Sequence, residues 1–487
     1  MSQPSTLRVP GPPAVPVLGA IANVGRFIWN PIAYLDALFR DYGPVAALVF
    51  GRSTRLVSTA AHPPGTVFVY GPELNRQLST EHGTFHKSAL SGPLYPQGEP
   101  TERTRPLART LTGLFGVNGD EHRQQRRLLM PAFHKKRIEG YRDDMVAITR
   151  SVLDAFRPGE TRDLRHDMSE LTLRVATQTL FGADLGQLGT QIGRDLQRWL
   201  ALFKYAAAVP FDVLGTPYRR WLDLTHALDR QMLRLLSEKR ASGASGSDIL
   251  SALLSATDGD GAPLSEDELI GHAGVLFAAG HETSSNALCW TLALLSQHPS
   301  VSAALDDELD AELHGEAPDV AQLAKLTLLD RVVKESLRLL PPAPLNHRIA
   351  SRDTELGGHH IPAGTELISS VYHTQRMPDL YPSPNRFLPE RWQGLDPGPY
   401  AYSPFGAGPR MCIGSSFALM EIKIVLSMLL SRFRLALPPK QIIDRDITIT
   451  MRPKGQLPMI VRRRDGNFAD SARGVRGDFR DMVELGG

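Results

Sequence analysis

The stretch SPFGAGPRMCIGSS, residues 403–416, places one cysteine, Cys412, among glycines, a proline and an arginine. Apolar residues resume behind it at helical spacing, so we expect Cys412 at the start of a helix. There the positive end of the helix dipole stabilises a thiolate, the form of cysteine that binds metals and acts as a nucleophile. Gly406, Gly408 and Gly414 are expected to take positive φ and to let backbone approach the sulfur. The loop therefore predicts a buried, ionised cysteine.

Several other roles are compatible with parts of this loop. A lone cysteine is most often a small core residue, which is our expectation for the second cysteine, Cys289. A phosphate-binding loop fails on spacing, because Met411 stands where a third glycine would be needed and no Lys-Ser/Thr pair follows. A zinc site would need further ligands near Cys412, such as a second cysteine or a Cys-x-x-Cys pair, and the loop has none. The residues alone leave open a structural cysteine, a metal ligand and a Cys–His nucleophile.

The composition narrows the class of protein. The chain has 487 residues, 42% of them hydrophobic, and a formal net charge of +2, so nothing in it favours nucleic acid as a partner. Two cysteines are too few for a disulfide framework and fit a reducing compartment. The first residues lack a secretion signal, and no stretch reaches the roughly 20 apolar residues that span a bilayer. We expect a cytoplasmic protein without a transmembrane anchor.

The chain reads as one unit, mostly helical, with a minor sheet. Residues 9–19 form a stiff proline-rich lead-in, residues 1–464 a single domain, and residues 465–487 a polar, loosely held tail. The longest helix should begin at Ser265, which forms a capping box with Glu268, and continue to about Gln297. It is apolar almost all round, so it should cross the interior.

The segment FGAGPRMCIG, residues 405–414, resembles the haem-binding loop of the cytochrome P450 family at every fixed position of the pattern F-x-x-G-x-R-x-C-x-G. The resemblance implies a mainly α fold with a small β region, in which haem b lies between the long helix and the cysteine loop. It makes Cys412 the metal ligand, a thiolate that favours O–O cleavage. Phe405 would then pack near the sulfur, Gly414 would border the cofactor, and Arg410 would pair with a haem propionate.

The long helix carries a second element of the family. In AAGHETSS, Glu282 and Thr283 lie inside an apolar run, where a carboxylate is costly without a partner or a role. By resemblance to [AG]-G-x-[ED]-T, Ala279 and Gly280 leave room for O2, Thr283 hydrogen-bonds the oxygen, and Glu282 relays protons. The plainer alternative is a closely packed helix with Thr283 back-bonded to the preceding turn. A zinc-protease motif is excluded, since HETSS lacks the second histidine of H-E-x-x-H.

Two further constellations agree with the resemblance. In KESLR, Glu335 and Arg338 share a helix face; such a pair is usually a solvated ion pair, but the family pattern makes it buried and adds Arg391 from PERW. We assign these three to folding and haem retention. For the haem propionates the implied partners are His122, Arg126 and Arg348, while neighbouring arginines such as Arg123 and Arg127 are expected to be solvated.

The implied reaction inserts one oxygen atom of O2 into an organic substrate and reduces the other to water. The chain shows no flavin or iron–sulfur motif, so the electrons would come from a separate ferredoxin or flavodoxin with an NAD(P)H reductase. The basic segments HRQQRR (122–127) and HKKR (134–137) are candidate docking surfaces or simply solvated helix faces. A haem-thiolate enzyme with another outcome, such as coupling, dehydration or isomerisation, and a non-catalytic haem protein that binds a ligand remain alternatives.

The resemblance also implies a substrate pocket formed by the loop 91–116 and residues of later segments. The later residues are Phe277, Ala278, Leu345, Asn346, Ile449 and Thr450. They are mostly apolar and favour an apolar substrate, with fatty acids expected ahead of terpenoids and macrocycles.

Overall fold

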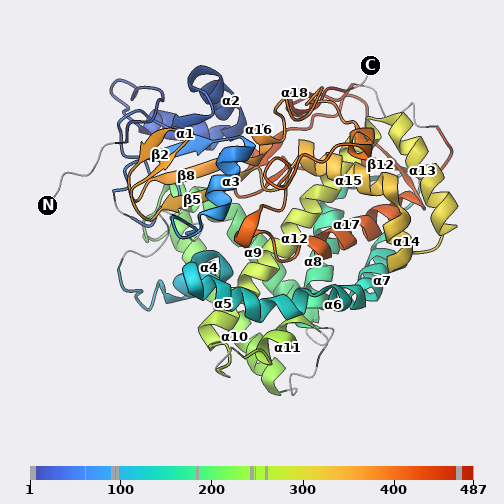
Figure 1. The fold of residues 1–487 in the computed structure, drawn as a ribbon. Helices are drawn as coiled ribbons and strands as arrows, with labels where there is room; N and C mark the ends of the chain where they lie inside the picture. Colours follow the sequence, from blue (N-terminus) through green and yellow to red (C-terminus); the bar gives the residue numbers. More distant parts are fainter. Residues whose placement is uncertain are drawn as a thin grey trace.

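Helices form most of the molecule, and short strands form small sheets, as the sequence predicts (Figure 1). The computed structural model describes residues 7–60, 62–88, 94, 98–182, 186–241, 246, 248–257, 262–467 and 474–485. Within these residues no helix combines the length and the apolar run that crossing a membrane requires.

The helices begin and end as follows: α1 (Ile21–Trp29), α2 (Pro31–Tyr42), α3 (Pro72–Thr80), α4 (Arg105–Gly116), α5 (Gly119–Leu129), η2 (Met130–Phe133), α6 (Lys135–Gly140), α7 (Arg142–Leu153), α8 (Leu164–Phe181), α9 (Gly186–Ala208), α10 (Pro217–Ala241), α11 (Ile249–Leu254), α12 (Glu266–Ser296), α13 (Pro299–Leu313), α14 (Val320–Lys325), α15 (Thr327–Leu339), α16 (Val371–Thr374), η4 (Pro389–Gln393), η5 (Gly408–Arg410), α17 (Ser415–Leu430) and α18 (Phe479–Met482). The strands are β1 (Val45–Ala47), β2 (Thr66–Val69), β3 (Phe85–His86), β4 (Thr161–Asp163), β5 (Leu345–Ala350), β6 (Thr354–Leu356), β7 (His359–Ile361), β8 (Glu366–Ser370), β9 (Arg434–Ala436), β10 (Arg445–Ile447), β11 (Met451–Pro453) and β12 (Pro458–Arg462).

Helix α12 forms the axis of the helical part and matches the predicted long helix within one residue at each end. The predicted capping box is present: the Glu268 N–H donates to Ser265 Oγ at 3.3 Å, and the Ser265 N–H donates to Glu268 Oε2 at 2.8 Å. From Ser284 to its end, α12 is buried throughout. It packs mainly on α8 and α4, with α15, α17 and β11 also in contact.

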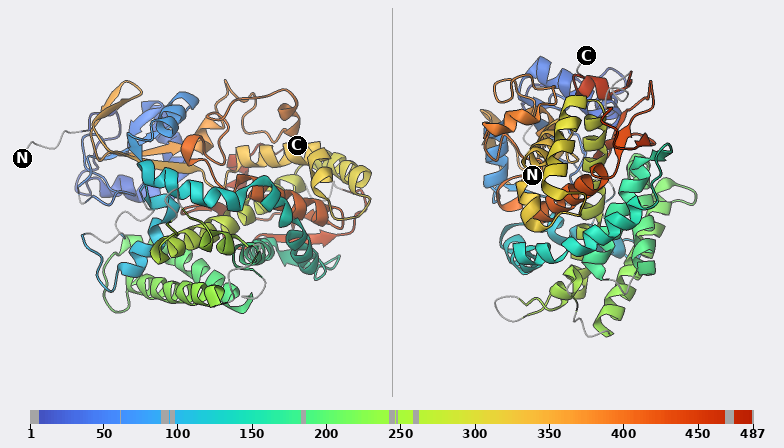
Figure 2. Two further views of the ribbon diagram at one scale, coloured as in Figure 1. Left: turned by 60° about the horizontal axis from the view of Figure 1, so that its bottom comes forward. Right: turned by 90° about the vertical axis from the view of Figure 1, so that its right-hand side faces the viewer.

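The larger sheet joins segments that are far apart in the sequence. Its strand order is β1-β2-β8-β5-β3, so strands from the first 90 residues flank β5 and β8 from the second half of the chain. Strand β2 is parallel to β8, with Thr66 opposite Glu366, and the other pairs are antiparallel. The left panel of Figure 2 shows this sheet at the end of the molecule that carries the N-terminus, together with the N-terminal helices. Pairing of this kind places β5, and with it Arg348, next to residues of the N-terminal region.

The last described segment packs against the body of the protein. Phe479, Met482 and Val483 are almost completely buried, and α18 lies at the top of the view in Figure 1. The loosely held tail expected for residues 465–487 is therefore wrong for residues 474–485. Polar composition misled the prediction, because three apolar residues spaced along one short turn are enough to dock it.

Candidate functional site

The glycine-rich loop is a compact turn that ends just before α17. The Cys412 N–H donates to the Phe405 carbonyl at 2.8 Å and closes the turn. Gly408 has φ +67°, and a Cβ there would lie 2.7 Å from the Ser79 carbonyl oxygen, so only glycine lets α3 approach this closely. Gly414 differs from expectation: its φ is −94°, so it serves as the residue before α17 and not as a left-handed turn.

Cys412 is accessible to solvent, whereas the prediction was a buried cysteine. Surrounding protein atoms nevertheless raise the pKa of its thiol, while a hydrogen bond from the Gly414 N–H and the positive charge of Arg126 act in the opposite direction. Cys289 is buried, and burial raises the pKa of its thiol to about 12. The two cysteines are thus different in kind: Cys412 is available to a ligand, and Cys289 is the small core residue that was expected.

Basic side chains gather beside the cysteine loop from four separate segments. His122 and Arg126 come from α5, Arg348 from β5 and Arg410 from η5; these are the four residues that the resemblance assigns to the propionates. Lys87, which sequence reasoning missed, follows β3 and joins them. Burial, and then the positive charges of Arg348 and Arg410, lower the pKa of Lys87 to about 7.

The other members of this basic cluster are affected in the same way. Burial, followed by the charges of Arg410 and Arg126, lowers the pKa of His122 to about 4. Burial lowers the pKa of Arg348 to about 10, and burial together with Arg348 and Arg126 lowers that of Arg410 to about 10. Such shifts mean that the charged form of these side chains is disfavoured, first because water is partly excluded and then because neighbouring positive charges repel it.

In the described part of the chain, none of the five side chains of the basic cluster forms an ion pair with a carboxylate. Arg410 donates to the carbonyls of Leu114 and Val117 and to Asn118 Oδ1, which are neutral acceptors. A group of buried and half-buried basic side chains without a counter-charge fits a bound anion with two negative charges. Next to an accessible cysteine, this is the donor set that haem with its two propionates requires.

The middle turns of helix α12, residues 274–283, are partly exposed except at Phe277 and His281, and they include one stripe along a single face. Val275, Ala279 and Thr283 are four residues apart and share a face, and each is partly exposed, whereas residues 284–296 are buried. Ala278 and Gly280 are also partly exposed. The hydroxyl of Thr283 donates to the Ala279 carbonyl at 2.7 Å, which is the back-bonded arrangement given above as the plainer alternative.

Glu282 points to a different side of α12 from Thr283. Its Oε1 accepts from Thr450 Oγ1 at 3.0 Å and from Arg452 Nη1 at 3.1 Å. Glu282 and Arg452 line a polar cleft of about 790 Å³ between α8, α9 and α12. The ion pair with Arg452 was not foreseen, because no local pattern connects residues 170 positions apart.

Two residues expected in the substrate pocket lie elsewhere. Phe277 is fully buried, and its ring packs on that of Phe181 in α8 with centroids 5.1 Å apart. Thr450 is buried against α12, where it donates to Glu282 and accepts from Asn286 Nδ2 at 3.2 Å. Both side chains contribute to packing between elements, so their assignment to the pocket is corrected.

The remaining pocket residues lie on three elements. Ala278 is on α12, Leu345 and Asn346 begin β5, and Ile449 lies in the turn between β10 and β11. All four are partly exposed. Of the loop 91–116, residues 91–93 and 95–97 lie outside the described residues, and the rest leads into α4.

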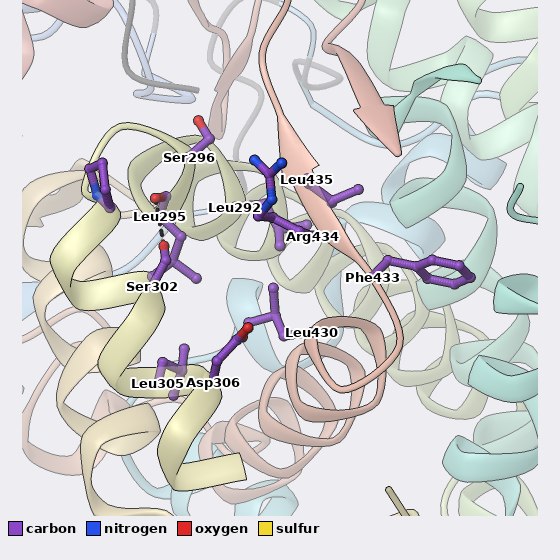
Figure 3. A pocket seen from close by; sticks show the side chains of 11 residues that line it. Leu292, Leu295, Ser296, Ser302, Leu305, Asp306, Leu430, Phe433, Arg434 and Leu435 are labelled. Atoms are coloured by element: carbon purple, nitrogen blue, oxygen red, sulfur yellow. Dashed lines mark hydrogen bonds between the residues drawn. The ribbon is translucent and has the colours of Figure 1, made fainter. Parts of the chain in front are cut away.

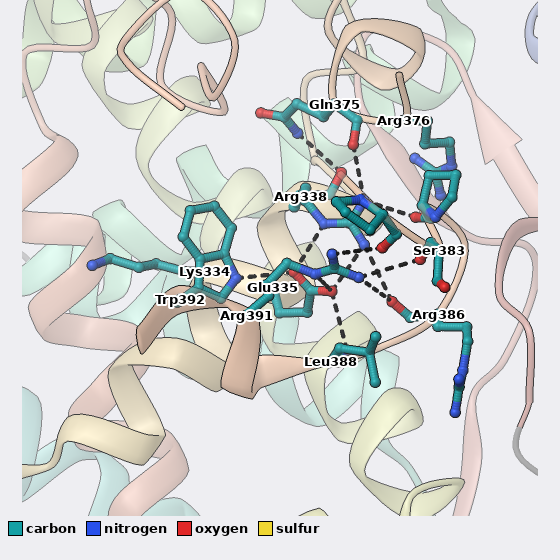
Figure 4. A network of polar contacts seen from close by, with 12 residues as sticks. Lys334, Glu335, Arg338, Gln375, Arg376, Ser383, Arg386, Leu388, Arg391 and Trp392 are labelled. Atoms are coloured by element: carbon teal, nitrogen blue, oxygen red, sulfur yellow. Dashed lines mark hydrogen bonds and ion pairs between the residues drawn. The ribbon is translucent and has the colours of Figure 1, made fainter. Parts of the chain in front are cut away.

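The ion pair of KESLR is buried and larger than the sequence predicts (Figure 4). Glu335 and Arg338 are 0% exposed, with Arg338 Nη2 2.8 Å from Glu335 Oε1. Arg391 Nε donates to Glu335 Oε1 at 2.9 Å, and Trp392 Nε1 donates to Glu335 Oε2 at 2.9 Å. Trp392 is thus a fourth member, and its place beside Arg391 in PERW was the available signal.

A small cavity lies at the C-terminal end of α12, between α13 and α17 (Figure 3). Its lining includes Leu292, Leu305 and Leu430, with Arg434 and Asp306 at its edge. The volume of about 20 Å³ holds about one water molecule, so this cavity is not a substrate site.

Comparison with known proteins identifies a family. Residues 9–459 match the family model described as Cytochrome P450. The cyclooctat-9-en-7-ol 5-monooxygenase of Streptomyces melanosporofaciens is 32% identical over 467 residues, which cover 93% of this chain and 95% of that protein. The pentalenene oxygenase of Streptomyces avermitilis is 30% identical, with 90% of this chain and 94% of that protein covered.

Solved structures agree with the sequence comparison. The structure described as retinoic acid bound cyanobacterial CYP120A1 has a TM-score of 0.79 and 26% identity, covering 94% of this chain and all of the other. The crystal structure of the cytochrome P450DA heme domain has a TM-score of 0.78 and 25% identity, and covers 95% of this chain.

Proposed function

The chain belongs to the cytochrome P450 family, and on that premise we propose that it oxygenates a terpenoid at a haem b held by Cys412. It is a haem-thiolate monooxygenase, which inserts one oxygen atom from O2 into an apolar organic substrate. The observation that carries the assignment to this site is the basic cluster without counter-charge beside an accessible cysteine.

The residues of the chain divide the binding of the cofactor among them. Cys412 would hold the haem iron through its sulfur, and the hydrogen bond from its N–H to the Phe405 carbonyl would fix the loop around it. The basic cluster, Lys87 included, would bind the two propionates. Ala279 and Gly280 are small, partly exposed residues of α12 that would leave room for O2 beside the cofactor. When bound through a thiolate, haem supplies the activation of O2.

Proton delivery is the task of the polar residues of α12. Glu282 lines the solvent-open cleft, so its carboxylate can take up a proton from water there. Thr283 lies on the partly exposed stripe, and its hydroxyl is held by the Ala279 carbonyl. We infer that Glu282 collects the proton and that Thr283 Oγ1 passes it on.

The substrate class follows from the relatives and from the residues of the pocket. Two relatives that cover 90% or more of this chain are named for the oxidation of cyclooctat-9-en-7-ol and of pentalenene, both terpenoids. This reverses the order expected from the sequence, which put fatty acids first. Ala278, Leu345 and Ile449 offer apolar surface, and Asn346 offers one polar group for a hydroxyl of the substrate. A cyclic terpenoid alcohol suits this combination.

Electrons reach this enzyme from separate proteins. We infer an acidic ferredoxin or flavodoxin as the partner, because exposed basic residues lie on α5 and α6: Arg123, Arg127, Lys135 and Lys136. Reversing the charge at Lys135 and Lys136 should slow turnover driven by such a partner, with the loss decreasing as salt increases. Unchanged turnover at low salt would place the docking surface elsewhere.

A binding and turnover experiment tests the assignment. Protein supplied with haem should show the thiolate-type carbon monoxide spectrum of the family. Cyclic terpenoid alcohols should then shift the iron spin state and give products one oxygen atom heavier when a surrogate ferredoxin and reductase supply electrons. Fatty acids of matched carbon number serve as the control. If only the fatty acids shift the spin state and are oxygenated, the terpenoid assignment is wrong.

A further inference from the structure

The hairpin formed by β10 and β11 is attached to one face of α12 by three successive side chains. Glu282 accepts from Thr450 and Arg452, Asn286 donates to Thr450, and Trp290 Nε1 donates to the Met451 carbonyl at 3.1 Å. The three helix residues are four apart and therefore lie along one line of the helix. The hairpin thus fixes where the Glu282 carboxylate points.

Charge pairing inside the hairpin holds Arg452 in place. Asp446 and Arg452 are directly opposite each other on the two strands, and Arg452 Nη2 lies 2.9 Å from Asp446 Oδ2. Arg452 therefore bridges two carboxylates, that of Asp446 and that of Glu282. Burial alone would raise the pKa of Asp446, but Arg452 and Lys204 outweigh it and lower that pKa.

The β10–β11 hairpin is too small to keep its position on α12 without support from other segments. Each strand has three residues, and an isolated two-stranded hairpin is at best marginally stable in water. What packs on its outer side must therefore decide where it sits.

A C-terminal segment, residues 475–483, provides that support. The Ile443 N–H donates to the Arg476 carbonyl at 2.9 Å, and the Arg476 N–H donates to the Gln441 carbonyl at 2.9 Å. The Phe479 N–H donates to the Ile443 carbonyl at 3.0 Å. These bonds hold the residues that lead directly into β10. The Arg445 N–H, at the first position of β10, donates to Asp478 Oδ2 at 3.3 Å.

The same segment also reaches β11 by a second route. The ring of Phe479 stacks on that of Trp290, with centroids 6.2 Å apart and planes at 9°. Trp290 is the residue whose indole N–H holds the Met451 carbonyl. Phe479 thus supports the residue that ties β11 to α12.

Gly477 shows that this contact is closely fitted. Its φ is +87°, and a Cβ there would clash with Asp444 Oδ1 and lie 2.8 Å from the Ile443 carbonyl oxygen. Gly474, just outside the segment, has a similar φ of +82°, but a Cβ there would meet Lys440 at 3.6 Å or more, an ordinary contact. Of these two glycines, only Gly477 is required by the close approach of neighbouring atoms, those of Ile443 and Asp444.

We propose that residues 475–483 act as a strap that positions the β10–β11 hairpin and, through Thr450 and Arg452, the Glu282 carboxylate for proton delivery. The strap lies beyond residues 9–459, the part of the chain that matches the family model. Phe479, Gly477 and Asp478 are positioning residues that act through the hairpin. The inference rests on the proposed function for its catalytic consequence, but its structural part stands independently.

The first test compares Gly477→Ala with Gly474→Ala, which has the same backbone strain without the clash. Amide hydrogen exchange of residues 445–453 should become faster in Gly477→Ala and stay as in the wild type in Gly474→Ala. Exchange in β5 and β8 should not change in either variant. This measurement needs neither substrate nor redox partner. Equal exchange of the hairpin in both variants would overturn the strap.

The second test measures coupling in the haem-loaded enzyme. In Gly477→Ala the product formed per NADPH should fall by about threefold or more, and peroxide should rise, while the carbon monoxide spectrum and substrate spin shift are kept. If Gly477→Ala loses haem, Phe479→Leu, which keeps apolar volume but removes the ring stack, takes its place. Faster exchange with unchanged coupling would overturn the link to Glu282.

A double variant separates this link from a general loss of stability. In an Arg452→Gln background, adding Gly477→Ala should lower the product formed per NADPH only slightly further. The contact of Arg452 with Glu282, through which the strap acts, is already lost in that background. Fully additive losses would contradict the proposal. If wild type and Gly474→Ala consume NADPH without forming any oxygenated product, the proposed function fails, while the exchange result on the strap remains valid.

Discussion

Glu282 Oε1 lies 3.1 Å from Nη1 of Arg452. The expected proton carrier of α12 is therefore paired with a residue of the β10–β11 hairpin. The hydroxyl of its neighbour Thr283 meanwhile donates to the Ala279 carbonyl. Glu282 and Thr283, the two residues of the proposed proton relay, are thus adjacent in sequence but held by different partners.

Replacing Arg452 tests this relationship. In Arg452→Gln, Glu282 loses a charge-assisted hydrogen bond and its fixed direction, so we expect the ratio of product to NADPH to fall by about tenfold. The solvent isotope effect on product formation should increase. Arg452→Lys keeps the charge and should lose less. Unchanged coupling in Arg452→Gln would show that the ion pair has no part in proton delivery.

The two cysteines provide a matched pair for the metal ligand. Cys412→Ser should abolish the thiolate-type carbon monoxide spectrum, because a serine hydroxyl does not replace the thiolate. Cys289→Ser should keep the spectrum, since Cys289 is buried in the core with its pKa raised to about 12. A thiolate-type spectrum in Cys412→Ser would remove Cys412 as the ligand.

The buried cluster around Glu335 should dominate stability. Glu335→Ala leaves Arg338 and Arg391 without their shared carboxylate, and breaking a buried ion pair from one side costs about 3–5 kcal/mol. We expect a lower midpoint in urea and weaker haem retention. Glu73→Ala, which breaks an exposed pair with Arg76, should change neither. Similar midpoints for both variants would contradict a structural role for Glu335.

Lys87 should give the haem-free protein a pH-dependent stability. Its pKa is lowered by burial and by neighbouring cations from 10.5 to about 7. Between these values the unfolded chain binds more protons than the folded protein, so stability should rise with pH through that range. In Lys87→Met this rise should become smaller, while the exposed Lys136→Met should keep it.

Urea midpoints at several pH values between about 7 and about 10 measure this slope. Haem should reduce the slope, because its propionates give Lys87 a counter-charge. A slope that is the same in wild type and Lys87→Met would remove Lys87 from the basic cluster.

The corrected position of Phe277 predicts a separation of stability from substrate binding. Phe277→Ala leaves a cavity against Phe181 and should lower the free energy of unfolding by about 3–5 kcal/mol. The order of preference among substrates should stay the same. Ala278→Val adds volume to the partly exposed side of α12 and should weaken the substrate spin shift with little loss of stability. The opposite result for the two variants would restore Phe277 to the pocket.

The amino-acid sequence was sufficient to predict the fold class, the long helix and the identity of the chemical groups. The cysteine loop, the E-x-x-R pair and the capping box at Ser265 are local patterns, in which spacing along the chain sets spacing in space. Local patterns of this kind are sufficient to place Glu335 beside Arg338 and Cys412 shortly before a helix, although α17 begins only at Ser415.

The tertiary structure decided which of these groups have partners. Lys87 joins the basic cluster only because β3 pairs with β5, and Arg452 reaches Glu282 only because the hairpin packs on α12. The same holds for the C-terminal segment, whose apolar anchor Phe479 stacks on Trp290 from a distant part of the chain. Charges and rings that meet through folding leave no periodic trace in the sequence, because their distance in space is set by the packing of whole elements.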